Sequence, residues 1–300
     1  MAPQQQDTQS AGTSTTASSI AEKSESVTKH KPIKNALNDE VEHFEFDHPE
    51  LRSVFPTTKH DPIPVLQYED RGLMADPTFK NLLKDASVTH LSPRIGTELS
   101  GIQLHQLTNA QRDELALLVS HRGVVFFRDQ EINIEQQLDL GRTYLFFGIP
   151  AYEAYERLTP PFKTFIEGLT AIHSNKAQAE RAERRGHTIR RAPVEFEHPV
   201  VRTHPVTGRK ALFVNPAFTR RIPQLSSRES DVVLKVLYKH ITEGHEFQVR
   251  FRWTKNAVAV WDNRITTHFA TFDYLPGNRH AVRVTTQGEI PYLDGEASRP

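Results

Sequence analysis

The stretch WDNRITTHFATFDYLPGNRHAVRV, residues 261–284, brings together side chains that could bind a metal ion and an anion. His268 carries an imidazole, the commonest metal ligand in proteins. Arg279 and Arg283 carry guanidinium groups, which grip carboxylate or sulfonate oxygens in a bidentate manner. These residue types predict a pocket with one metal ligand and two anion-binding groups.

The spacing of these residues predicts that they converge across a chain reversal. Pro276–Gly277 suits the central positions of a type II turn, because proline fixes the first φ and glycine supplies the positive second φ. A reversal there puts His268 opposite a residue close to Arg283. Beyond the turn, Arg279, Ala281 and Arg283 are two apart and share one face of a predicted strand. A structural histidine and two solvated arginines stay an alternative, so the pattern alone indicates an anion pocket and no more.

The composition narrows the chemistry to histidine, carboxylate and arginine side chains. The 300 residues contain no cysteine, which excludes disulfides, thiolate zinc sites and cysteine nucleophiles, whereas 15 histidines leave a metal site open. Lys plus Arg and Asp plus Glu both number 37, so no net charge favours nucleic acid or an anionic membrane. No secretion signal or membrane-spanning stretch occurs, so a small partner and the cytoplasm are expected.

The chain divides into four regions by composition. Residues 1–40 are rich in Ser, Thr and Gln and cannot bury enough surface to offset the entropy of ordering, so a disordered tail is expected. Residues 41–87 carry scattered aromatics and prolines, which suggest an irregular arm. A folded domain is expected over 88–290, followed by a C-terminal tail at 291–300.

Two helices are predicted, over 107–123 and 226–244. Each begins with a capping box and is followed by a glycine that can end it. The residues concerned are Thr108, Gln111 and Gly123 in the first helix and Ser226, Glu229 and Gly244 in the second.

Short apolar or alternating runs predict strands between and after these helices. They cover 124–129, 194–205, 210–215, 247–253, 256–262 and 279–286. The segment FQVRFRW at 247–253 alternates cleanly between apolar and polar residues. Many short strands with few helices predict a mainly β fold with flanking helices, as an antiparallel sandwich or barrel.

Five stretches resemble the taurine and sulfonate dioxygenase family, in a form most similar to its fungal sulfonate branch. They are LSPRIGTELSGIQL (91–104), ELALLVSHRGVVFFRDQ (114–130), EAYERLTPPFKTFIEGLTAIHS (153–174), HPVVRTHPVTGRKALFVNPAFTRRI (198–222) and VWDNRITTHFATFDYLPGNRHAVRVTTQGE (260–289). Together they cover most of residues 88–290. The resemblance implies a double-stranded β-helix, or jelly roll, and an enzyme that depends on Fe(II) and 2-oxoglutarate.

The resemblance also implies a role for each of the three candidate residues. In this family two histidines and one carboxylate hold the iron, and His268 corresponds to the distal histidine. Arg279 corresponds to the partner of the distal carboxylate of 2-oxoglutarate. Arg283 is the candidate for binding the sulfonate of a taurine-like substrate. The implied reaction hydroxylates the carbon next to sulfur, after which sulfite leaves.

The other two iron ligands of the family, a His-x-Asp motif, have no counterpart at the corresponding place. No His-x-Asp occurs in the 300 residues. INIEQQLDLGRTYLFFGIPAYEAYERL runs directly from one family element into the next, which predicts an internal deletion between about 145 and 150 that removes the motif and some strands. Two pairs with similar spacing, His43 with Glu45 and His48 with Glu50, precede the folded domain. The candidate substitutes near matching strands are His198, His204 and Asp262, and two of them would have to reach one ion together with His268.

These observations leave three hypotheses open. The first is a 2-oxoglutarate-dependent sulfonate dioxygenase whose activity is impaired by the loss of two iron ligands. The second is a non-catalytic relative that keeps the Arg279 and Arg283 anion pocket or pairs with complete relatives. The third is an incomplete gene model or a decaying gene copy, in which an exon was skipped. Carboxylates, sulfates and sulfonates all satisfy a guanidinium, and a homo-oligomer is compatible with the sequence.

Overall fold

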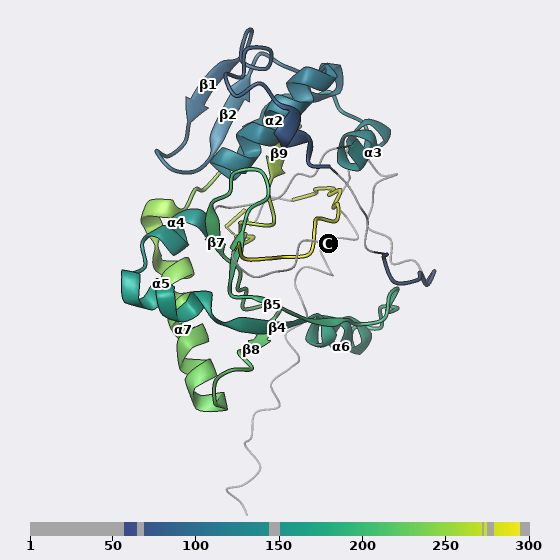
Figure 1. The fold of residues 1–300 in the computed structure, drawn as a ribbon. Coiled ribbons are helices and arrows are strands. Elements are labelled where there is room, and N and C mark those ends of the chain that lie inside the picture. The colour runs from purple at the N-terminus through teal and green to yellow at the C-terminus, as the bar shows by residue number, and fades with distance from the viewer. Residues whose placement is uncertain (1–56, 65–68, 144–150, 272, 275–278, 295–300) are drawn as a thin grey trace, which may run out of the picture. The chain divides into compact units, whose positions relative to one another are not determined.

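The computed structural model describes residues 57–64, 69–143, 151–271, 273–274 and 279–294. The strands in this part of the chain form a four-stranded, a three-stranded and a two-stranded sheet, and Figure 1 shows them with the helices. The expected tail at 1–40, the turn at Pro276–Gly277 and the deletion junction at 145–150 lie outside the described residues.

The four-stranded sheet packs against one helix. It contains β1 Ser87–His90, β2 Thr97–Ser100, β3 Val124–Phe127 and β9 Val258–Trp261, in the order β1-β2-β3-β9. Neighbours run antiparallel except β2 and β3, which are parallel. Helix α2, Asn109–Arg122, connects that pair, because parallel strands need a crossover. Leu115 of α2 is buried in one cluster with Leu99 of β2 and Phe127 of β3, so helix and sheet share a core.

α2 begins and ends where the sequence predicts. Thr108 Oγ1 accepts a hydrogen bond from the Gln111 N–H, and Gln111 Oε1 accepts one from the Thr108 N–H at 2.9 Å. Gly123 ends the helix with a φ of 73°, a left-handed value that glycine adopts without strain. Ser226 and Glu229 form the same capping box at the start of α7, Ser227–Glu243. Both helix predictions are confirmed.

A second core lies between α7 and the two smaller sheets. The three-stranded sheet has the order β5-β4-β8 and consists of β4 Thr170–Ser174, β5 Glu195–Pro199 and β8 Thr219–Arg221. The two-stranded sheet pairs β6 Val201–Thr203 with β7 Lys210–Leu212. Leu237 of α7 is buried in one cluster with Ala171 of β4 and Val201 of β6.

The other described helices are short. They are α3 Ile134–Thr143, α4 Ala151–Glu156, α5 Pro160–Glu167 and α6 Lys176–Arg184, with 3-10 helices η3 Arg71–Met74, η4 Leu104–Gln106 and η5 His245–Phe247. A bilayer-spanning helix, long and apolar throughout, is not found in the described ranges. Of the expected arm at 41–87, the described part contacts the body at His60, whose N–H donates to the Arg190 carbonyl at 2.7 Å.

The strands predicted from 124, 194, 210 and 256 onward are confirmed as β3, β5 with β6, β7 and β9, but the strand predicted at 247–253 is wrong. Phe247 belongs to η5, and no strand follows it before β9. Phe251 instead stacks on Phe126 of β3, with ring centroids 4.0 Å apart and planes 8° from parallel. Alternation indicates one apolar side, and packing on the face of a sheet satisfies it without a backbone ladder.

The strand predicted at 279–286 is also absent from the described structure. The face that Arg279, Ala281 and Arg283 would have shared is therefore not formed. Val284 packs against α3, where the Cβ that Gly141 lacks would lie 2.5 Å from Val284 Cγ1. A contact of this kind holds one side chain in place, but it does not make the side chains of the segment alternate between two faces as they do in a strand.

Candidate anion-binding site

Asp262 organises the turn that follows β9 and leads to His268. Its Oδ1 accepts a hydrogen bond from the Arg264 N–H at 3.0 Å, and its carbonyl oxygen accepts one from the Thr266 hydroxyl at 2.8 Å. An aspartate that caps the backbone two residues on favours a turn, so the ladder ends at Trp261. The Trp261 ring meets the His268 imidazole at 64°, with centroids 5.7 Å apart, which places the histidine at the end of β9.

The structure brings Arg279 and Arg283 within electrostatic reach of His268. Partial burial lowers the pKa of His268 below its usual value, and the positive charges of Arg283 and Arg279 lower the pKa further. Arg279 and Arg283 are exposed at the surface, and His268 is partly exposed there. The imidazole is therefore neutral at pH 7 while two guanidinium groups face solvent, an arrangement that suits a small anion.

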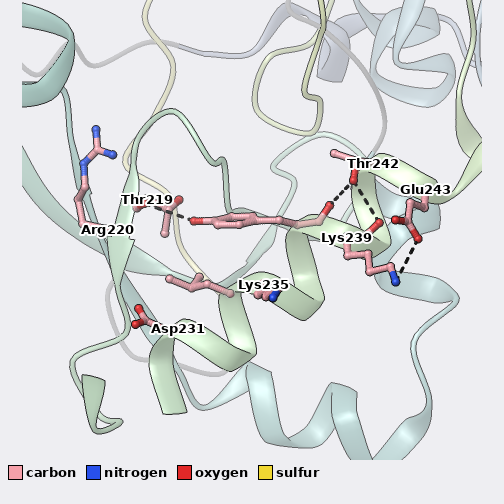
Figure 2. Close-up of a pocket in the computed structure, with 9 residues that line it drawn as sticks. Thr219, Arg220, Asp231, Lys235, Lys239, Thr242 and Glu243 are labelled. Carbon is pink, nitrogen blue, oxygen red and sulfur yellow. Dashed lines mark hydrogen bonds and ion pairs between the residues drawn. The ribbon is translucent and has the colours of Figure 1, made fainter. Parts of the chain in front are cut away.

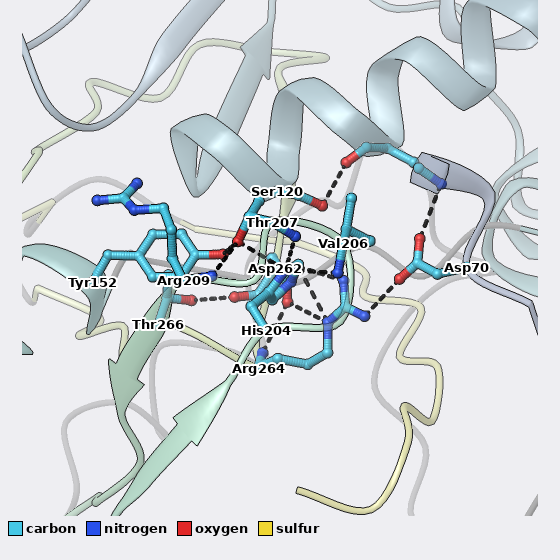
Figure 3. A network of polar contacts seen from close by, with 12 residues as sticks. Asp70, Ser120, Tyr152, His204, Val206, Thr207, Arg209, Asp262, Arg264 and Thr266 are labelled. Carbon is cyan, nitrogen blue, oxygen red and sulfur yellow. Dashed lines mark hydrogen bonds and ion pairs between the residues drawn. The ribbon is translucent and has the colours of Figure 1, made fainter. Parts of the chain in front are cut away.

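A buried polar network lies beside this turn, as Figure 3 shows. His204 Nε2 lies 2.8 Å from Asp262 Oδ2, and both side chains are almost fully buried. Arg264 donates to the same carboxylate from Nε at 2.9 Å and from Nη2 at 2.6 Å. Burial alone would raise the pKa of Asp262, but the Arg264 charge and the His204 hydrogen bond outweigh it and lower the pKa. The carboxylate is therefore ionised.

The described residues do not fit an iron site. No three of the described histidine, aspartate and glutamate side chains lie close enough to hold one metal ion. His204 uses Nε2 for Asp262, and its Nδ1 accepts from the Val206 and Thr207 N–H groups at 3.3 Å each. Asp262 is occupied by that imidazole and by a guanidinium. These two candidate substitutes therefore have no free donor to share an ion with His268.

His198, the third candidate substitute, belongs to a different cluster. It lies on β5 and packs edge on against His173 of β4, with ring centroids 5.5 Å apart. Burial lowers the pKa of both imidazoles, that of His173 to about 4. The positive charge of Arg202 lowers the pKa of His198 further, so the pair forms a neutral part of the sheet packing. The pairs His43 with Glu45 and His48 with Glu50 lie outside the described residues.

A separate open groove runs along α7, shown in Figure 2. Its lining combines the cations Arg220, Lys235 and Lys239 with the carboxylates Asp231 and Glu243. Lys239 Nζ and Glu243 Oε2 pair at 3.6 Å. The groove is formed by α7 and β8, whereas the candidate site follows β9. Because positive and negative side chains both line the groove, the groove has no preference for an anion.

The described chain combines sheets and packed helices, and His268, after β9, is within electrostatic reach of two arginines. The profile of the family described as "Taurine catabolism dioxygenase TauD, TfdA family" matches residues 87–153 and 149–285. The chain belongs to this family. The predicted fold class, mainly β with flanking helices in a jelly roll, is thereby confirmed.

Two yeast proteins show the same relationship over most of the chain. A Schizosaccharomyces pombe protein, provisionally named an alpha-ketoglutarate-dependent sulfonate dioxygenase, is 38% identical and covers 81% of this chain and 80% of its own length. The alpha-ketoglutarate-dependent sulfonate dioxygenase of Saccharomyces cerevisiae is 33% identical and covers 80% and 77%. Among solved structures, a taurine dioxygenase from Burkholderia xenovorans is 25% identical with a TM-score of 0.54, covering 64% of this chain and 85% of that chain.

The alignments also reveal a gap inside this chain. The alignment with the S. pombe protein spans 313 positions, whereas 81% of 300 residues is about 243, so at least about 70 positions of that relative have no counterpart here. The family profile matches in two pieces that meet at residues 149–153. This junction adjoins the place where the sequence predicts the deletion.

Asp70, Arg264 and Glu289 join the buried network, although no sequence motif marks them as functional residues. Arg264 Nη1 donates to Asp70 Oδ2 at 2.6 Å and lies 3.4 Å from Glu289 Oε2. The sequence does hold one local signal, because Asp262 directly after an apolar run is typical of a side-chain-capped turn. The partners that Arg264 takes across the fold leave no such signal.

Proposed function

We propose that this protein handles the ligands of its family, 2-oxoglutarate and a small sulfonate, at His268, Arg279 and Arg283. Arg279 binds the distal carboxylate of 2-oxoglutarate, and Arg283 binds the sulfonate of the substrate. Within the described part of the chain, His268 is the imidazole that would ligate Fe(II), as the counterpart of the family's distal histidine. The observation that carries the proposal is that the positive charges of both arginines act on His268, in a chain whose yeast relatives are named as sulfonate dioxygenases.

The few side chains available to ligate iron limit the reaction that this chain can catalyse with these ligands. Hydroxylation of a sulfonate with sulfite release needs an iron held by more than one protein side chain. His204 and Asp262 are bound to each other, and His198 lies on β5 beside His173 of β4. We therefore propose an impaired member of the sulfonate dioxygenases, in which anion binding persists and turnover does not. Its expected location is the cytoplasm.

Calorimetric titration with 2-oxoglutarate, without metal and with anaerobic Fe(II), tests this function. The expected result is binding that needs no metal and is lost in Arg279→Ala. A matched control is Arg252→Ala, which removes an exposed arginine outside the site. Absence of 2-oxoglutarate and sulfonate binding would refute the proposal. Stoichiometric iron with sulfite released from taurine would replace it with a fully active enzyme.

An intact dioxygenase assembled with a complete relative is the second candidate. The gap of at least about 70 positions favours it, because the missing polypeptide is what a relative would supply. Mixing this chain with the S. cerevisiae relative and measuring molar mass by light scattering tests it. Co-elution as a mixed species is expected under this candidate, and separate elution rejects it.

A further inference from the structure

The candidate site lies on two segments, 262–271 and 279–289, that are not held together by hydrogen bonds between strands. Within the described residues, 262–271 and 279–289 contain no helix and no strand. Arg279 and Arg283 both carry positive charge on the second of these segments, and like charges repel each other. Something other than a backbone ladder must keep the arginine-bearing segment close to His268.

Arg264 is the side chain placed to do so. Its side chain is 5% exposed and binds carboxylates from three parts of the chain. Asp262 accepts from Nη2 at 2.6 Å, Asp70 accepts from Nη1 at 2.6 Å, and Glu289 Oε2 lies 3.4 Å from Nη1. A buried guanidinium needs such partners, because an unpaired buried charge is costly. Arg264 precedes His268 by four residues, so this pairing fixes the histidine-bearing segment.

Glu289 ties the other segment to the same point. Its second carboxylate oxygen accepts from Arg202 Nη2, and the Arg202 side chain on β6 is 2% exposed. The Arg202 guanidinium also lies over the Phe213 ring, 5.1 Å from its centroid. Glu289 therefore connects a fixed strand, through one carboxylate, with the guanidinium that anchors the histidine segment. Arg283 lies six residues before Glu289, on the segment that this carboxylate holds.

We infer that Glu289 and Arg264 are positioning residues, which hold Arg279 and Arg283 at His268 so that an anion meets all three groups together. Neither Glu289 nor Arg264 needs to touch the ligand. The effect is preorganisation: a ligand bound by two guanidinium groups loses affinity when the protein must first bring them together. This role rests on the proposed function, because it concerns the same site.

Glu289→Gln, which keeps the size of the side chain and removes its charge, tests the inference. The first measurement is 2-oxoglutarate binding by calorimetry, where an affinity loss on the order of tenfold is expected. The second is limited trypsin digestion without any ligand, with the rate of cleavage after Arg279 and Arg283 followed by mass spectrometry. If Glu289 no longer holds the segment, cleavage at these arginines should become several-fold faster, because a detached segment fits a protease more readily. Glu243→Gln, at an exposed position on α7, is the matched control and should change neither quantity.

The two measurements separate the failure of this inference from the failure of the proposed function. Wild-type protein that does not bind 2-oxoglutarate defeats the proposed function, while the ligand-free digestion still reports on Glu289. Unchanged cleavage after Arg279 and Arg283 in a folded Glu289→Gln protein overturns the positioning role. If Glu289→Gln does not fold, Glu289→Asp keeps the charge and shortens the reach, and it should also speed cleavage at both arginines. Unchanged cleavage in Glu289→Asp would then count against the inference.

Discussion

The four-stranded sheet and the segments around His268 are held by different forces, although β9 connects them. In the sheet, Val124 to Phe127 pair with Val258 to Trp261 in register, and apolar side chains are buried beneath α2. Around His268 the described residues form no ladder, and buried ion pairs centred on Arg264 fix the chain. Apolar burial is spread over many contacts, whereas an ionic network fails when one partner is lost.

Among the changes considered, removal of the Asp262 carboxylate should lower the free energy of unfolding most. Asp262→Ala leaves Arg264 and His204 buried without their shared carboxylate, and breaking such a pair costs about 4 kcal/mol. We expect the free energy of unfolding to fall by that amount in urea denaturation. Asp231→Ala, which removes an exposed carboxylate of α7, should change it by less than about 0.5 kcal/mol. Equal effects of the two variants would show that the network does not stabilise the fold.

A cavity beside the four-stranded sheet should lower the free energy of unfolding somewhat less than Asp262→Ala does, and it should leave the candidate site intact. Leu99 on β2 is fully buried, and Leu99→Ala is expected to lower the free energy of unfolding by about 3 kcal/mol. Binding of 2-oxoglutarate below the unfolding transition should be unchanged. Leu73→Ala, at a leucine that is 56% exposed, is the control and should lower stability only slightly. A loss of anion affinity in Leu99→Ala would mean that the two regions are not independent.

The partly buried pair of His173 and His198 makes the β4–β5 region sensitive to acid. Burial gives His173 a folded-state pKa of about 4, below the usual 6.5 of the unfolded chain. As the pH falls, the unfolded chain therefore takes up the proton first, so this stabilisation is complete above about 6.5 and is lost toward 4. We expect a loss of about 1 to 2 kcal/mol over that window. Thermal unfolding of His173→Gln should lack this component, whereas His245→Gln should retain it.

The smallest expected effect concerns the contact between α3 and residues 279–289, the segment that contains Arg279 and Arg283. A Cβ at Gly141 would meet Val284 Cγ1 at 2.5 Å, so Gly141→Ala must displace Val284 next to Arg283. The strain exceeds the gain in helix propensity, and a net destabilisation of about 1 kcal/mol is expected. Calorimetry should also show weaker 2-oxoglutarate binding. Gly168→Ala, where the added Cβ meets nothing within 4 Å, is the control.

Local rules predict the parts of the fold that depend on near neighbours. Both capping boxes and the strand β9 follow from residues within a few positions of each other, and each is found where expected. The strand predicted at 247–253 is wrong for a physical reason. An alternating pattern indicates that one side of the segment is apolar. It does not indicate whether the backbone pairs with a strand or whether the apolar side chains pack on the face of a sheet, as Phe251 packs on Phe126.

The sequence by itself determined the family, the identity of His268, Arg279 and Arg283 as candidates, and the lack of a His-x-Asp pair, since these depend only on residue types and spacing. Only the tertiary structure decided that His204 and Asp262 bind each other, and that Arg264 joins Asp70 to Glu289. Asp70 and Arg264 are 194 positions apart along the chain. A buried charge takes whichever opposite charge the fold places beside it, and no local pattern records that choice.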